Sequence, residues 1–152
     1  MSTTAPDGVA STTRTTFSRS TRIARHIDAD AAMVWRLLTA AAEWPRWNST
    51  VVSLDGQITL GSKVKLVSTL VPSRTFRLKV KEFEPNARLT FGNPMFTRTC
   101  SLSGEAGGTR VVMIERISGP FYPFVARMIP PLDENMEKFT ADLKKAAEAS
   151  AS

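Results

Sequence analysis

The stretch IDADAAMVWRLLTAAAEWPRWNSTVVSLDG, residues 27–56, changes from a helical to an extended pattern and sets the order of the elements around it. Asp28 or Asp30 can cap a helix whose apolar side chains then recur at intervals of three and four residues. Pro45 ends this helix or opens a short second one, because proline is tolerated only in the first turn. The apolar run that follows predicts a strand. One or two helices are therefore predicted after a first strand.

The residues on the N-terminal side of this stretch are of two kinds. Residues 1–15 are rich in Ser and Thr and contain almost no large apolar side chain, so we expect them to be disordered. Residues 17–27 show a weak strand pattern. Because 152 residues are enough to bury one core, residues 16–149 are predicted to form a single domain.

The middle of the chain alternates between apolar and polar side chains with a period of two, which is typical of half-buried strands. Short turns join the segments, so they are expected to pair as neighbours in an antiparallel sheet. The last two are joined by EAGG, which predicts a hairpin. The segments are KVKLVSTL (63–70), RTFRLKVK (74–81), RLTFG (88–92), FTRTCSLSG (96–104) and TRVVMIERIS (109–118).

The C-terminal segment returns to a helical pattern, and a Pro-Pro pair at 130–131 separates it from the residues before it. Together with the strands, this long amphipathic helix predicts an α+β fold. A curved antiparallel sheet of six to seven strands is expected to wrap around the C-terminal helix. The apolar positions of the helix are Leu132, Met136, Phe139, Leu143 and Ala146.

A strongly curved sheet around one helix leaves interior space unless large side chains fill it. Phe and Met suit an adaptable apolar pocket, but the same residues can simply form the core, and the sequence leaves both interpretations open. The two tryptophans of WPRW either cover one end of the pocket or fasten the short helix to the sheet. The candidate ligand-binding residues are Trp44, Trp47, Phe76, Phe91, Phe96, Arg98, Met113, Glu115, Phe121, Phe124, Met128, Met136 and Phe139.

The register of the hairpin decides where two charged side chains lie. If EAGG is a four-residue loop, Leu102 faces Val111 and Arg98 faces Glu115. Both pairs are then on the interior face. The charged pair either braces the sheet as a partly buried salt bridge or forms the polar end of the pocket, with Arg98 holding a carboxylate or enolate oxygen and Glu115 acting as a base. A structural or binding role is favoured over catalysis.

Three stretches resemble the START-like or SRPBCC superfamily, which has the helix-grip fold, and in particular its polyketide cyclase/dehydratase-like branch. Residues 27–56 are similar to the family's opening, in which a strand leads to x-A-x-x-x-V-W and then to W-x-x-W-N. VKEFEPNARLTF (80–91) is similar to its fourth-strand exit, and GGTRVVMIERISGPFYPFVARM (107–128) to its last strand and the entry to the C-terminal helix. The resemblance covers residues 17–148. It implies the helix-grip fold and leaves several activities open.

The resemblance and the expected architecture together imply a ligand-binding protein. The ligand is a small hydrophobic or amphipathic molecule, such as a lipid, a polyketide or an isoprenoid-like metabolite, held between the sheet and the C-terminal helix. The first alternative is an enzyme of the polyketide cyclase or aromatase type that uses Arg98 and Glu115. The second is a protein-interaction module of the co-chaperone kind. No cofactor is expected in any of these cases.

The net charge of +6 is unevenly distributed, because residues 61–98 contain eight Lys or Arg and only two Asp or Glu. The basic residues of two neighbouring strands alternate with apolar ones and are therefore predicted to face solvent. No aromatic residues alternate with them to stack on nucleic-acid bases, so specific nucleic-acid binding is not expected. Weak contact with an anionic membrane is an alternative to a simply solvated face. These residues are Lys63, Lys65, Arg77, Lys79 and Lys81.

The remaining composition excludes several classes of protein. A single cysteine rules out an intrachain disulfide, and one cysteine with one histidine rules out a Cys/His metal site. No apolar run approaches the ~20 residues that a membrane-spanning helix requires. The N-terminal residues lack the apolar core of a signal peptide. We therefore expect a cytoplasmic protein, and its oligomeric state stays open.

Overall fold

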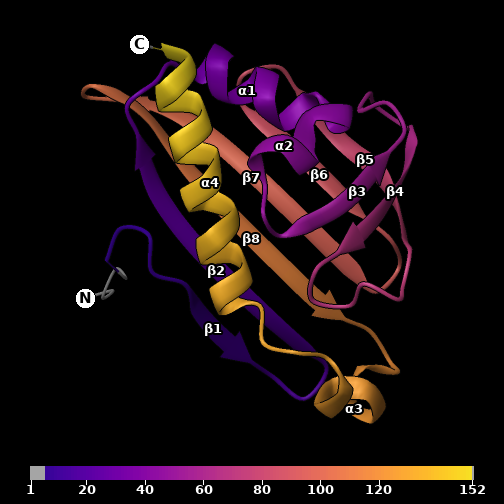
Figure 1. Ribbon diagram of the computed structural model, residues 1–152. Helices are drawn as coiled ribbons and strands as arrows, with labels where there is room; N and C mark the ends of the chain where they lie inside the picture. Colours follow the sequence, from indigo (N-terminus) through magenta and orange to yellow (C-terminus); the bar gives the residue numbers. More distant parts are fainter. Residues whose placement is uncertain (1–5, 152) are drawn as a thin grey trace.

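The computed structural model describes residues 6–151, and in them one antiparallel sheet of eight strands packs against a long helix (Figure 1). The strand order is β1-β2-β8-β7-β6-β5-β4-β3. The strands are β1 (Ser11–Arg14), β2 (Ser18–Ile27), β3 (Val51–Asp55), β4 (Lys63–Ser68), β5 (Phe76–Glu84), β6 (Arg88–Gly92), β7 (Phe96–Glu105) and β8 (Gly108–Ser118). The helices are α1 (Ala31–Thr39), η1 (Ala41–Glu43), α2 (Trp44–Trp47), α3 (Tyr122–Val125), η2 (Ala126–Met128) and α4 (Asp133–Ala151).

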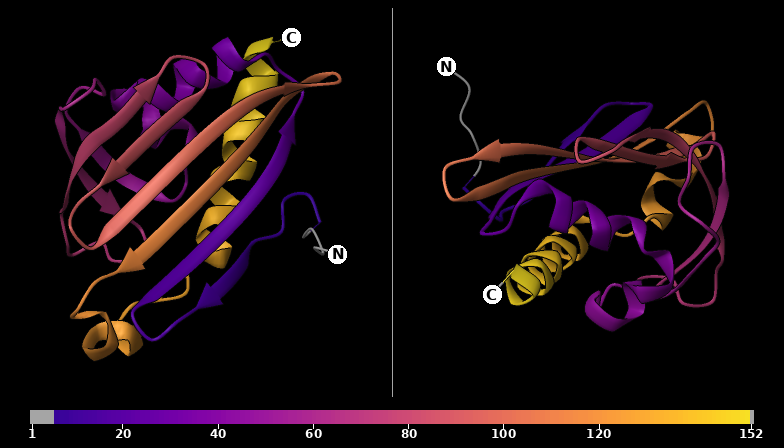
Figure 2. Two further views of the ribbon diagram at one scale, coloured as in Figure 1. Left: turned by 180° about the vertical axis from the view of Figure 1, so that it is seen from behind. Right: turned by 90° about the horizontal axis from the view of Figure 1, so that it is seen from above.

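Helix α4 crosses one face of the curved sheet, which we call the inner face, and the opposite outer face carries no helix (Figure 2). Helices α1 and α2 lie beside α4 on the same side of the sheet. This arrangement confirms the predicted α+β helix-grip fold, with eight strands in the sheet rather than the six to seven expected. Four buried side chains of α4 face the sheet at intervals of three and four residues, which are Met136, Phe139, Leu143 and Ala147. The last of them is Ala147 rather than the predicted Ala146.

The N-terminal segment differs from its prediction. Residues 11–14, which were expected to be disordered, form strand β1 and pair with β2. The Thr12 hydroxyl lies 2.9 Å from that of Thr21 and donates to the Asp133 carboxylate at 3.0 Å. Edge pairing and these side-chain hydrogen bonds replace the apolar burial that the composition cannot supply. Residues 1–5 of the expected disordered segment lie outside the described residues.

The hairpin of β7 and β8 has the predicted register. Arg98 pairs with Glu115 and Leu102 with Val111, so both charged side chains point to the inner face. The hairpin closes one pair further than predicted, because Glu105 pairs with Gly108. The turn is then two residues long, and Gly107 takes a φ of 81°, a conformation that glycine adopts without strain.

Truncation of a buried α4 side chain tests whether α4 closes the core. Leu143→Ala should lower the free energy of unfolding by about 2–5 kcal/mol, because it leaves a cavity between helix and sheet. Lys145→Ala, an exposed position on the same helix, should change it by less than about 0.5 kcal/mol. Urea denaturation measures both. Equal effects of the two substitutions would show that α4 is not packed as described.

Candidate functional site

Four aromatic rings meet between the sheet and α4. Trp44 lies 5.4 Å from Phe139 and 6.1 Å from Phe91, measured between ring centroids, with edge-to-face geometry in both pairs. Trp47 lies 5.9 Å from Trp44 and 5.7 Å from Phe139. Such pairs add to the stability that burial alone provides. The rings fasten α2 to both α4 and the sheet.

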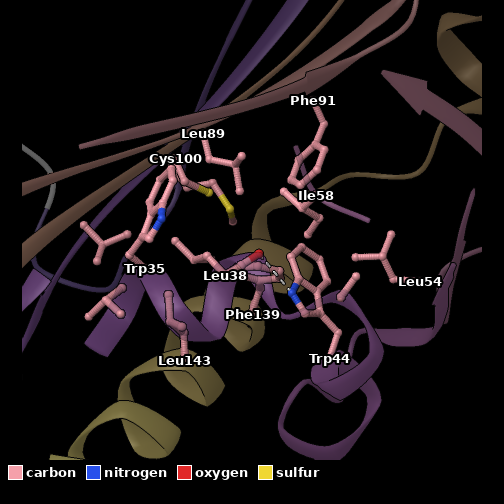
Figure 3. Packing of buried hydrophobic residues seen from close by; sticks show 14 of the residues in the cluster. Trp35, Leu38, Trp44, Leu54, Ile58, Leu89, Phe91, Cys100, Phe139 and Leu143 are labelled. Carbon is pink, nitrogen blue, oxygen red and sulfur yellow. Dashed lines mark hydrogen bonds between the residues drawn. The ribbon is translucent and has the colours of Figure 1, made fainter. Parts of the chain in front are cut away.

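The two tryptophans of WPRW have different environments. Trp44 is buried, and its indole N–H donates to the Leu38 carbonyl at 3.2 Å, as Figure 3 shows. It therefore belongs to the core. Trp47 is only half-buried, and its buried indole nitrogen has no hydrogen-bond partner among the described residues. Trp47 is thus the tryptophan that can accept a new partner or move.

A buried ion pair lies next to these rings. Glu115 is 1% exposed, and one of its carboxylate oxygens accepts a hydrogen bond from Nε of Arg98 and forms an ion pair with Nη2. The Arg98 guanidinium carbon also lies 5.1 Å from the centroid of the Phe139 ring, within the range of a cation–π contact. The pair therefore joins strands β7 and β8 to helix α4.

Further polar side chains extend this pair along the inner face of β2. Thr21 is paired with Glu115 across the strands and is buried. Arg19 is buried too, and it donates to the carbonyls of Ile129 and Pro130 at 3.2 and 2.9 Å. Burial lowers the pKa of Arg19, although the nearby Tyr122 hydroxyl and Glu115 carboxylate oppose this. Arg19, Arg98 and Glu115 are therefore buried charged groups on neighbouring strands, and the Asp133 carboxylate also acts on Arg19.

Arg19 and Thr21 were not among the predicted site residues. Both side chains lie on the inner face of β2, as the side chain of Ile23 does, and this alternation was the signal that could have revealed them. The alternation is hard to recognise in the sequence because Ser and Arg also occupy positions on the outer face of the strand.

The interior space beside the ion pair is small. The space beside the ion pair has a volume of about 10 Å³, enough for at most one water molecule. Of the predicted lining residues, Phe91, Met113, Met136 and Phe139 are buried in the core, while Phe76 and Phe96 are partly buried against it. The walls of this space are formed by Trp44, Leu54, Leu66, Leu78, Phe91 and Arg98.

Three predicted lining residues do not reach the interior. Phe121, Phe124 and Met128 are 72%, 81% and 79% exposed. Helices α3 and η2 lie beyond the end of the sheet, so only Tyr122 of this segment turns inward and is buried (Figure 1). The prediction for Phe121, Phe124 and Met128 was therefore wrong, because a short apolar segment gives no sign of which face it buries.

A reactive thiol or a metal site would be another source of chemistry in the described residues. Burial raises the pKa of the Cys100 thiol to about 12, which keeps it neutral and weakly nucleophilic. No group of three or more His, Cys, Asp or Glu is arranged to hold a metal within the described part of the chain.

None of the helices in residues 6–151 is long and apolar enough to cross a membrane. An open depression of about 360 Å³ lies between residues 39–43 and 56–59 and contains none of the predicted site residues.

Comparison with known proteins places this geometry in a family. Residues 13–148 match the sequence model of the family described as polyketide cyclase / dehydrase and lipid transport. No curated protein matches the chain.

Solved structures share the fold at low sequence identity. A protein from Rhodobacter sphaeroides is 22% identical with a TM-score of 0.69, over 92% of this chain and 98% of that protein. A protein from Nitrosomonas europaea is 15% identical with a TM-score of 0.70, over 91% and 98%. DynU16, from the dynemicin biosynthetic locus, is 21% identical with a TM-score of 0.64, over 86% of this chain but only 47% of DynU16.

A double-mutant cycle tests the ion pair. Arg98→Met and Glu115→Leu should each lower the free energy of unfolding by about 3–5 kcal/mol, because each leaves the opposite charge buried and unpaired. The double variant should lose less than the sum of the two. Urea denaturation gives all three values. As a control, Arg88→Met breaks an exposed ion pair with Glu82, 3.5 Å long, and should cost at most about 1 kcal/mol. Additive, small effects at Arg98 and Glu115 would contradict a buried pair.

Proposed function

Because this chain belongs to the polyketide cyclase / dehydrase and lipid transport family, we propose that it binds a small apolar or amphipathic molecule between the sheet and α4. The polar end of the ligand lies at Arg98, and its apolar part lies among the aromatic rings. A lipid, a polyketide or an isoprenoid-like metabolite has this chemistry.

The observation that carries the proposal is the buried charge beside an apolar interior. Stability does not require it, since replacing a buried ion pair by well-packed apolar residues is often neutral or stabilising. Two guanidinium groups, those of Arg19 and Arg98, are buried with one buried carboxylate, Glu115, and the Asp133 carboxylate also acts on Arg19. A guanidinium in this setting binds a carboxylate or enolate oxygen strongly, because charge-assisted hydrogen bonds strengthen away from water. We therefore assign an oxyanion or similar polar group to the ligand.

Binding requires the interior to open, because pockets for molecules of this size have volumes of hundreds of cubic ångströms. The space beside Arg98 has about 10 Å³. Trp47 is the side chain best suited to move, since it is half-buried, belongs to a four-residue helix and has an indole nitrogen with no hydrogen-bond partner within residues 6–151. Met113 and Met136 then adjust, because the unbranched methionine side chain repacks at low cost.

Catalysis of the cyclase type is a second candidate, favoured by the position of Glu115. Its carboxylate lies inside the molecule on the face that the ligand would occupy, where a base is shielded from water. The substitution Glu115→Gln separates the two functions. It should leave ligand binding in place and abolish turnover of a polyketide substrate if the protein is an enzyme.

A binding experiment with two probes tests the proposal. Native mass spectrometry before and after organic extraction first shows whether a ligand copurifies. Calorimetry then compares decanoate with 1-decanol, which share an apolar chain and differ in the head group. Decanoate should bind more tightly. In the double variant Arg98→Met/Glu115→Leu the affinity for decanoate should fall about tenfold or more, because its carboxylate loses the guanidinium, and decanol should be little affected.

The variant Lys79→Met is the matched control, because it removes one positive charge from the outer face. It should bind both probes as the unmodified protein does. If neither probe saturates and no mass is lost on extraction, the proposed ligand binding is wrong. An equal loss of decanoate and decanol in the double variant would contradict the role of Arg98 in head-group recognition.

A further inference from the structure

Four large apolar side chains are exposed together at one end of the molecule. Phe121, Phe124 and Met128 of the segment 119–128 are among the most exposed large apolar residues in the described chain. Phe17, 58% exposed, lies in the adjacent turn between β1 and β2, where its carbonyl accepts a hydrogen bond from the Gly119 amide at 3.2 Å. We call Phe17 and residues 119–128 the apolar tip. Large apolar side chains exposed close together are typical of an interaction site.

The apolar tip is held in a defined shape. Gly119 takes a φ of 131°, which a residue with a side chain rarely adopts, and Tyr122 is buried as an anchor. Phe121, Phe124 and Met128 are each more than 70% exposed, whereas Tyr122 in the same segment is 4% exposed. The tip therefore presents its apolar side chains outward while Tyr122 attaches it to the core.

The charges around the tip are positive. Residues 116–132 contain two arginines and no acidic residue. Arg116 and Arg127 are exposed, and so is Arg14 at the end of β1. The acidic residues that follow are already engaged: Asp133 accepts from Thr12, and Glu134 lies 3.4 Å from Lys138. Exposed apolar side chains with arginines near them complement a lipid bilayer, which has an apolar interior and can carry anionic head groups.

We propose that the apolar tip inserts into the interface of an anionic lipid bilayer. A second copy of the chain fits the tip less well, because two basic tips would repel each other. The ten residues of segment 119–128 also fall short of the roughly 20–30 residues per side that a stable protein interface involves. The proposal does not depend on ligand binding in the interior, since the tip and the ion pair are separate sets of residues.

Vesicle sedimentation tests the proposal. The protein should bind vesicles of phosphatidylcholine with about 30% phosphatidylglycerol, and bind pure phosphatidylcholine more weakly. The variant Phe121→Ser/Phe124→Ser/Met128→Ser should lose about tenfold or more in partitioning, because each removed side chain gives up apolar contact with the acyl region. Arg127→Glu and a rise to ~0.5 M salt should each weaken binding to the anionic vesicles.

The variant Val52→Ser/Leu60→Ser is the matched control, because both residues are exposed and apolar and lie on β3 and the β3–β4 loop. It should sediment with anionic vesicles as the unmodified protein does. Circular dichroism confirms that each variant is folded.

Three results would overturn the proposal. One is that the unmodified protein fails to bind anionic vesicles. Another is that the triple variant binds anionic vesicles as well as the unmodified protein does. In that case, loss of binding in the variant Lys79→Glu/Lys81→Glu would assign the membrane contact to the outer face of the sheet. The third is a concentration-dependent dimer that disappears in the triple variant, which would identify the tip as a self-association surface. Failure here leaves the calorimetry with decanoate unaffected, so the two proposals are tested separately.

Discussion

A single helix has to cover the inner face of a sheet that is much wider than the helix. Eight strands spaced about 4.8 Å apart span roughly 35 Å, whereas a helix with its side chains is about 10–12 Å across. Curvature reduces the difference but does not remove it. The uncovered part of the inner face must therefore be filled from elsewhere. Helices α1 and α2 supply Trp35 and Trp44 for one part of it, and buried polar side chains occupy another.

The candidate site lies where the side chains packed on the inner face of the sheet change from apolar to polar. On one side of Arg98 are the rings of Trp44 and Phe139, and on the other are Glu115 and the inner-face residues of β2. A head group and an apolar chain can both be accommodated at such a boundary. In the structure described here the boundary is closed, and the binding proposal therefore depends on the movement of side chains such as Trp47. Under the binding proposal, closure of the interior around the ligand would keep it away from water.

Sequence patterns predicted the fold well in segments long enough to show a regular period, because the period tells which side chains face the interior. The β7–β8 hairpin is the best example, since its short loop and strict alternation placed Arg98 opposite Glu115 on the interior side. The same reasoning failed for segment 119–128, because a few residues of short helix do not establish a period. It also failed for β1, whose Ser and Thr residues become ordered only through Asp133 and the edge of β2, which are tertiary contacts. The small size of the space beside Arg98 could not be predicted, since a sequence pattern reveals which residues are inside and not how closely they pack.

The indole N–H resonances of the three tryptophans offer the most direct test of the central claim, that the interior opens beside Arg98 to admit an amphipathic molecule. The Trp47 indole nitrogen has no hydrogen-bond partner in the described part of the chain, Trp44 donates to Leu38, and Trp35 packs against Phe83 elsewhere in the core. In ¹H–¹⁵N spectra recorded during a titration with decanoate, the Trp47 and Trp44 signals should shift and saturate together while Trp35 changes little. Shifts of all three in proportion would indicate a general loosening of the core. No shift at Trp44 or Trp47 up to saturation of the calorimetric signal would place the ligand elsewhere and contradict the account.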